Sequence, residues 1–270
     1  MTPGDFERNQ QDKLISDRMG RVGRKILVMS GKGGVGKSTV AGYLALLLSK
    51  KGKKVGLMDV DLHGPSIAGL MKVQGGFDLS QKGLVKPYAF SPQLSIVSLD
   101  MMLGDKDMAV IWRGPMKISA IRQFVSDIEW GNLDFLLVDA PPGTGDEPLT
   151  VAQTIPDAEA LIVTTPQEMS LADVRKSINF CRQVNMKILG VVENMSGQLC
   201  PHCGGQVSLF GQGGGEKMAR EMNVPFLGQI PADGKMVEAG DMGNLEGLMA
   251  QEDLEINVAY GNILKKVFAD

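Results

Sequence analysis

The sequence predicts an α/β fold, with a single domain built on a mostly parallel sheet flanked by helices on both faces. Two observations carry this prediction. Apolar runs of strand length recur along the chain, with little of the polar alternation that a half-exposed strand shows. Segments of helix length separate most of these runs, and strands that alternate with helices form parallel sheets through right-handed crossovers.

Six apolar runs are expected to form the strands of this sheet. They are Ile26–Met29, Val55–Met58, Phe135–Val138, Ala160–Thr164, Ile188–Val192 and Phe226–Ile230. Two of the intervening segments, Ser38–Lys51 and Ser170–Val184, carry apolar residues at helical spacing. The stretch Leu84–Asp100 has two prolines and apolar residues at alternate positions, so we expect an inserted hairpin there.

The chain is expected to divide into a polar N-terminal arm, residues 1–23, and one domain, residues 24–270. Of the 270 residues, 43% are hydrophobic and 22% are charged, which is ordinary for a globular domain of this length. The formal net charge of -3 provides no basic field for nucleic acid. Because no secretory leader or membrane-length apolar stretch is visible, we expect a soluble cytoplasmic protein without nucleic-acid or membrane partners.

The first candidate site lies between the first expected strand and the helix after it. Its sequence is Gly31-Lys32-Gly33-Gly34-Val35-Gly36-Lys37-Ser38-Thr39, which fits the pattern G-x-x-x-x-G-K-[ST]. Glycines let backbone N–H groups surround a phosphate, and the helix N-terminus adds its positive end. All nine residues are therefore predicted to bind ATP, with Lys37 bridging the β- and γ-phosphates and Ser38 ligating Mg²⁺.

Acidic residues follow two further strands, where the carboxyl ends of a parallel sheet face the ligand. Asp59 and Asp61 come directly after Val55–Met58, and Asp139 ends another apolar run. We expect one carboxylate of the first pair to hold the Mg²⁺ shell and the other to orient or deprotonate the attacking water. Asp139 is predicted to contact Mg²⁺ through water. Gly143 is predicted to donate its N–H to the γ-phosphate and so to sense hydrolysis.

The sequence Cys200-Pro201-His202-Cys203 is a lone C-x-x-C, and three interpretations of it compete. It is a knuckle for a metal ion or cluster, a redox dithiol, or an inert loop. Gly204-Gly205 follow, which is a poor start for the helix that a redox pair needs, so the knuckle is favoured. Zn²⁺ or a four-iron cluster takes four ligands, and Cys181 lies at a core-facing helical position. Two chains are therefore expected to share one site as a homodimer.

Together these motifs resemble the Mrp/ApbC family of iron–sulfur carrier ATPases, within the MinD-like group of P-loop proteins. The resemblance runs from about Ile26 to the end of the sequence. The pieces that carry it are the Lys32/Lys37 loop, Asp59-Val60-Asp61 with Gly64-Pro65-Ser66, Trp112-Arg113-Gly114-Pro115, Asp139-Ala140-Pro141-Pro142-Gly143-Thr144-Gly145-Asp146, Glu193-Asn194-Met195-Ser196 and Cys200 to Cys203. MinD and ParA lack the cysteine pair.

The resemblance implies roles for four further residues. Lys32 is implied to reach across the dimer to the partner's nucleotide, and Asp61 to activate water. Asn194 is implied to read the adenine edge, since an amide both donates and accepts, with the loop at Pro231 beside it.

The resemblance also implies an ATPase with slow, regulatory hydrolysis. It holds a labile 4Fe-4S cluster between the cysteine pairs of its two chains and delivers the cluster to apo-proteins. The alternative is a MinD-like or ParA-like ATP switch in which Cys200 and Cys203 form a structural zinc clasp. Thiolates bind both metals, so the ligands alone do not decide between the two.

Overall fold

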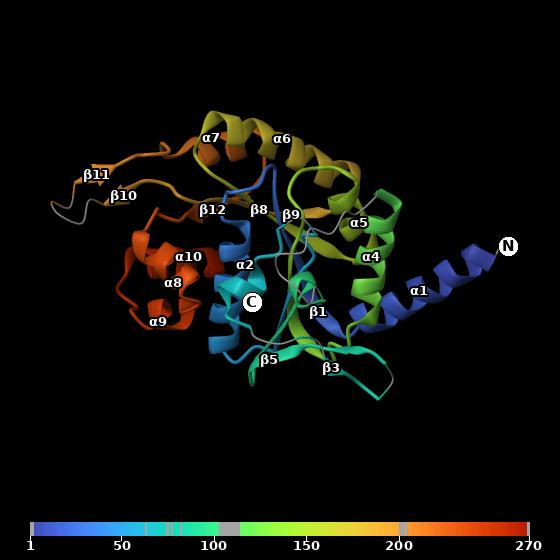
Figure 1. Ribbon diagram of the computed structural model, residues 1–270. Helices are drawn as coiled ribbons and strands as arrows, with labels where there is room; N and C mark the ends of the chain where they lie inside the picture. Colours follow the sequence, from blue (N-terminus) through green and yellow to red (C-terminus); the bar gives the residue numbers. More distant parts are fainter. Residues whose placement is uncertain are drawn as a thin grey trace.

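The computed structural model describes residues 3–62, 64–73, 76, 78–81, 83–102, 114–199, 203 and 205–268. Within these residues one large sheet is enclosed by helices on both faces, and two short strand pairs lie outside it (Figure 1). The predicted α/β fold class is confirmed.

The large sheet has the strand order β12-β9-β8-β1-β7-β2-β6-β5. Neighbouring strands pair in parallel, except that β5 at one edge runs antiparallel to β6. The strands are β1 Val22–Ser30, β2 Val55–Asp59, β5 Tyr88–Ser91, β6 Leu94–Ser98, β7 Leu133–Asp139, β8 Ala158–Thr164, β9 Lys187–Glu193 and β12 Phe226–Gln229. All six predicted runs form strands of this sheet.

The edge of the sheet differs from the expected inserted hairpin. An antiparallel pair, β5 and β6, does occur within Leu84–Asp100, but β6 also pairs in parallel with β2 and so extends the main sheet. Ser98 at the end of β6 is fully buried, and its hydroxyl donates to the carboxylate of Asp59, 3.2 Å away. This polar residue therefore forms a hydrogen bond inside the protein and does not mark an exposed face of the strand.

Helices cover the two faces of the sheet in two groups (Figure 1). One group contains α2 Lys37–Lys50, α3 Ile67–Leu70, α8 Gly234–Asp241, α9 Leu245–Met249 and α10 Glu255–Phe268; the other contains α1 Pro3–Met19, α4 Gly114–Asp127, α5 Asp146–Thr154, α6 Glu168–Gln183 and α7 Gly214–Glu221. Strand β1 supplies Ile26 and Val28 to the first apolar cluster and Leu27 and Met29 to the second. Burial on both faces explains why the central strands are apolar throughout.

The N-terminal segment, predicted as a polar arm, packs against the domain. It forms α1, in which Ile15 and Met19 are buried beside α4. On the exposed side of the same contact, Arg122 of α4 forms an ion pair with Asp12. Ile15 and Met19 are four positions apart and therefore share one helix face, a signal that the polar composition of the segment conceals. Strand β1 also begins at Val22, inside the predicted arm.

Two short strand pairs and one helical turn complete the described elements. The strands are β3 Asp78–Leu79 with β4 Val85–Lys86, and β10 Gln198–Leu199 with β11 Gln206–Val207, while Leu99–Met102 is a 3-10 helix. Figure 1 shows β10 and β11 extending away from the body of the protein. We call residues 198–212 the cysteine arm. No helix in the described part of the chain is both long and apolar enough to cross a membrane.

Candidate functional site

The predicted phosphate loop connects β1 to α2 at the carboxyl edge of the sheet. Gly36 adopts a left-handed conformation with φ of 80° and directly precedes the helix. A Cβ at this position would lie 2.2 Å from the Nδ2 atom of Asn194, so only glycine fits. At the start of the loop, a Cβ at Gly31 would lie 2.5 Å from the backbone of Asp173 in α6. Both ends of the loop are thus fixed by close packing.

Lys37 and Ser38, the first two residues of α2, both contact Asp139 at the end of β7. The Nζ atom of Lys37 lies 2.5 Å from Oδ1 of Asp139, and this lysine is only 7% exposed. The hydroxyl of Ser38 donates to Oδ2 of the same carboxylate. The structure therefore brings together the three side chains that the sequence predicted for phosphate and Mg²⁺ binding.

Asp59 lies beside Asp139, because β2 and β7 are paired with these two residues in register. Its carboxylate accepts hydrogen bonds from the backbone N–H groups of Asp61, Ser66 and Ile67, at 3.1, 2.9 and 3.0 Å. Both carboxyl groups are fully buried. Burial, reinforced by the nearby charge of Asp139, raises the pKa of Asp59 to about 7. Burial also raises the pKa of Asp139, against the opposing effect of Lys37.

Asp61 follows Asp59 in the loop after β2 and is 8% exposed. Its Oδ1 atom accepts a hydrogen bond from the backbone N–H of Gly64 at 3.3 Å. Its charge adds to the forces that raise the pKa of Asp139, so the two carboxylates are close in space. The predicted action of Asp61 on water stays a prediction.

Gly143 lies in the loop after β7, in a left-handed conformation with φ of 87°. Its N–H donates to the carbonyl of Ser30 at 2.8 Å, which holds this loop against the end of β1. The predicted contact with the γ-phosphate needs the N–H to leave Ser30. Gly143 is therefore positioned beside the phosphate loop, and its sensing role stays a prediction.

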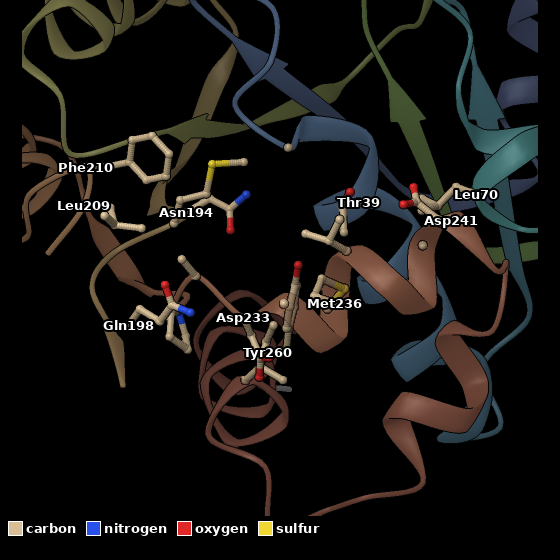
Figure 2. Close-up of a pocket in the computed structure, with 18 of the residues that line it drawn as sticks. Thr39, Leu70, Asn194, Gln198, Leu209, Phe210, Asp233, Met236, Asp241 and Tyr260 are labelled. Carbon is tan, nitrogen blue, oxygen red and sulfur yellow. The ribbon is translucent and has the colours of Figure 1, made fainter. Parts of the chain in front are cut away.

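Asn194 follows β9 and is 7% exposed. Its Nδ2 atom donates to the carbonyl of Val35 at 2.9 Å, and its own N–H donates to the carbonyl of Thr164. Figure 2 shows the side-chain oxygen of Asn194 turned toward the cavity. One amide hydrogen is thus used to fix the phosphate loop, while the oxygen remains available to accept from a nucleotide base.

A cavity of about 770 Å³ opens beside the phosphate loop, and Gly36, Thr39, Asn194 and Pro231 all line it (Figure 2). Its size suits a nucleotide, since small-molecule pockets are about 300–1,000 Å³. Its walls also contain residues that the sequence analysis did not assign to the site: Gln198, Leu209, Phe210, Met236 and Tyr260. Helical spacing predicts Tyr260 only as a core residue of the C-terminal helix. For Leu209 and Phe210, the one signal available was a large apolar pair in the glycine-rich stretch after the cysteines.

The outer side of the phosphate loop faces open space. Gly33 and Gly34 are exposed, and nothing lies within 4 Å of a Cβ built on either. Lys32 beside them is partly exposed, and its carbonyl accepts a hydrogen bond from the hydroxyl of Ser30 at 2.9 Å. The predicted reach of Lys32 into a partner chain stays a prediction, and this side of the loop leaves room for it.

The cysteines occupy two different environments. Cys203 is exposed on the cysteine arm, whereas its predicted partner Cys200 lies outside the described residues. Cys181 is fully buried in α6, with its Sγ atom 3.9 Å from Sδ of Met29. Burial raises the pKa of the Cys181 thiol to about 12, which makes it unreactive. The prediction that Cys181 is a packed core residue is confirmed.

Glu193 at the end of β9 holds the two segments that flank the cysteine arm. This fully buried carboxylate accepts from the hydroxyl of Ser196, at 2.5 Å, on the segment that leaves the strand. It also accepts from the N–H groups of Gly213 and Gly215 on the segment that returns. The arm is therefore anchored at the residue next to Asn194.

Known proteins of named function are similar to this chain over most of its length. A relative from Methanocaldococcus jannaschii, called an iron-sulfur cluster carrier protein, is 49% identical over 259 residues, covering 96% of this chain and 88% of its own. A cytosolic Fe-S cluster assembly factor of Kluyveromyces lactis is also 49% identical, covering 90% of this chain and 89% of its own. The structure of an Archaeoglobus fulgidus nucleotide-binding protein, described in complex with ADP, superposes with a TM-score of 0.77. It is 40% identical and covers 88% of this chain and 93% of its own.

The family model described as NUBPL iron-transfer P-loop NTPase, named ParA, matches residues 21–268. This match contains the phosphate loop, both buried aspartates, Asn194 and the cysteine arm. The site is a nucleotide-binding site, and the chain belongs to the NUBPL-type iron-transfer family of P-loop NTPases.

Proposed function

We propose that this protein is an ATP-binding and ATP-hydrolysing iron–sulfur cluster carrier. It holds a labile 4Fe-4S cluster at a homodimer interface and transfers it to apo-proteins. The observation that carries this proposal is the exposed Cys203 on an arm rooted beside Asn194, because it joins a metal-binding thiol to the nucleotide pocket. The relatives named as cluster carrier and cluster assembly factor support the same activity, and the word cytosolic in one name supports a cytoplasmic location.

The residues around the phosphate loop fit Mg²⁺. The donors are a hydroxyl and buried carboxylates, which are the hard oxygen ligands that this ion prefers. Two carboxyl groups buried side by side, both with raised pKa values, also form a place where a cation would relieve repulsion. Ser38 would hold the ion directly, with Asp59 and Asp139 in its shell. When bound, Mg²⁺ neutralises phosphate charge.

The protein's own groups then bind and orient ATP. Lys37 exchanges part of its contact with Asp139 for the β- and γ-phosphates. Asp61 orients the attacking water, and Lys32 extends to the nucleotide of the partner chain. Because Lys32 has to come from a second copy, hydrolysis is coupled to dimerisation and is slow and regulatory.

Coupling between nucleotide and cluster needs only a short path. Asn194 contacts the phosphate loop, and the adjacent Glu193 fixes both segments that flank the cysteine arm. A cluster held by two thiolates from each chain is exposed and therefore labile, as transfer requires. A coupling free energy of about 1–3 kcal/mol between the two sites is enough for regulation.

The test is anaerobic cluster reconstitution on the wild-type protein and on the double variant Cys200→Ala/Cys203→Ala. Cluster type is read by Mössbauer spectroscopy and assembly by size exclusion. We expect one four-iron cluster per dimer in the wild type and none in the double variant. Cys181→Ala is the matched control, because it removes a buried thiol and leaves the arm intact.

Two outcomes contradict the carrier proposal. The first is that no cluster is taken up by the wild type. The second is that Zn²⁺ occupies the cysteine site and iron does not displace it. Either outcome favours the zinc-clasped ATP switch.

A further inference from the structure

The cysteine arm supplies part of the wall of the nucleotide cavity. Leu209 and Phe210, which follow β11, line the same cavity as Asn194 and the phosphate loop. Gln198, at the start of the arm, lines it too. Leu209 is 70% exposed and Phe210 is 38% exposed, so neither side chain is held in the core. Large apolar side chains exposed at the mouth of a polar-edged pocket indicate that a ligand covers them.

The opposite wall of the cavity is also apolar. Figure 2 shows Leu209 and Phe210 on one side of the cavity, Met236 and Tyr260 on another, and the Asn194 amide between the two groups. A flat aromatic ring bound here has apolar groups against its faces and a hydrogen-bonding group at its edge. That is the arrangement that a nucleotide base requires, because its faces are apolar and its edge is polar.

We propose that Phe210, together with Leu209, packs against the base of the bound nucleotide, so that the cysteine arm is itself part of the nucleotide site. The inference deepens the proposed function and rests on its nucleotide site alone, not on the cluster. Bound nucleotide then holds the arm in one position, and loss of the nucleotide releases it.

Two features carry this effect to the cysteines. Strands β10 and β11 pair with Gln198 opposite Val207 and Leu199 opposite Gln206, so both sides of the arm move together. Glu193 fixes the segments that flank the arm at Ser196, Gly213 and Gly215. The strand pairing and the Glu193 hydrogen bonds form within the chain and need no nucleotide. The proposed contact of Phe210 with the base forms only when nucleotide is bound. By linkage, whatever binds at the cysteines changes nucleotide affinity by the same factor.

The test measures binding of Mg·ADP to the metal-free, full-length protein by calorimetry. Phe210→Ala is compared with wild type and with Val207→Ala, which is a matched control because Val207 is 39% exposed on the same arm but lies outside the cavity. Stacking of a base on an aromatic ring is worth about 1–3 kcal/mol, so we expect about tenfold weaker ADP binding for Phe210→Ala. Val207→Ala should bind as wild type does.

A second ligand separates a base contact from general damage. Inorganic tripolyphosphate occupies the phosphate loop without a base, and its affinity should be the same in all three proteins. Hydrogen exchange of residues 205–213 should slow on adding ADP to the wild type, and much less so in Phe210→Ala. Tripolyphosphate should give no such protection.

Three results overturn the inference: unchanged ADP affinity in Phe210→Ala, equal loss of ADP and tripolyphosphate binding, or a change in self-association alone. The last would mean that a second copy of the chain covers Phe210. Because neither iron nor zinc is added, failure here leaves the cluster-carrier proposal untouched, and failure to reconstitute a cluster leaves this inference untouched.

Discussion

At the scale of residues, the central feature is a pair of buried carboxyl groups at one level of the sheet. Asp59 and Asp139 are register partners on β2 and β7, and neither is exposed. Backbone N–H groups, Ser98, Lys37 and Ser38 supply their hydrogen bonds. Burial raises the pKa of each carboxyl, the charge of a neighbouring carboxylate adds to this effect, and Lys37 opposes it only in part.

This pair predicts a pH dependence of stability. The pKa of Asp59 is raised from 3.8 to about 7, so between these values the folded protein binds more protons than the unfolded chain. Its contribution to stability is therefore fully present below about pH 3.8 and is lost as the pH rises to about 7. The free energy of unfolding of wild type minus that of Asp59→Asn should fall between these two pH values and stay level above the higher one. Urea unfolding of the two metal-free proteins at each pH measures this difference in the free energy of unfolding.

Substituting Asp59 with asparagine also places an amide donor against backbone N–H groups, which lowers stability at every pH. The test therefore depends on how the difference in the free energy of unfolding between wild type and Asp59→Asn changes with pH, and not on the size of that difference. A difference that is constant with pH, or that grows toward pH 8, contradicts the raised pKa.

At the scale of elements, α1 shows how a segment composed mostly of polar residues is held in place. Most of its side chains with described surroundings are exposed, but Met19 is fully buried and Ile15 is 3% exposed against α4. Two apolar residues on one face are enough when the neighbouring helix presents a complementary surface. The C-terminal part of the helix is therefore packed against the domain, a contact that the polar composition of the predicted arm does not reveal.

A matched pair of substitutions in α1 tests this packing. Met19→Ala removes a buried side chain and leaves a cavity, so we expect it to lower the free energy of unfolding by about 2–5 kcal/mol. Leu14→Ala, in the same helix but 49% exposed, should change stability by less than about 0.5 kcal/mol. Denaturant unfolding compares them. Equal and small effects would show that α1 is detached in solution.

At the scale of the whole molecule, the single chain leaves two surfaces that a dimer would use. One is the open side of the phosphate loop at Gly33 and Gly34, beside Lys32. The other is the cysteine arm, which extends from the body and carries the exposed Cys203 (Figure 1). Two identical chains facing each other across both surfaces would complete a nucleotide site and a cluster site at once.

The dimer proposal predicts that Lys32→Ala retains nucleotide binding and loses dimerisation. ADP affinity should be retained, because Lys37 and the loop backbone of the same chain are intact. Dimerisation with a non-hydrolysable ATP analogue, measured by analytical ultracentrifugation, and ATP hydrolysis should both be lost. The exposed Lys51→Ala at the end of α2 is the control. Normal hydrolysis by Lys32→Ala would exclude the cross-chain role.

Local sequence determined much of the nucleotide site. The phosphate loop, Asp59 and Asp139 each follow an apolar strand, and the carboxyl ends of parallel strands meet at one edge of a sheet. The position of these groups at one edge of the sheet therefore follows from the chain's own pattern. The burial of Cys181 was predictable for a similar reason, since helical spacing places it on the apolar face of α6.

Other features were decided only by tertiary structure. Each of them joins segments that are far apart in the chain. They are the packing of α1 against α4, the place of β6 in the main sheet, the hydrogen bonds of Glu193 to both segments that flank the cysteine arm, and the position of Phe210 and Tyr260 in the wall of one cavity. Periodicity reports which face of an element is buried, but not what lies against it. The sequence by itself determined where the residues predicted to bind phosphate and metal gather, because strand ends meet by topology. Packing of distant helices and loops decided which side chains line the rest of the cavity.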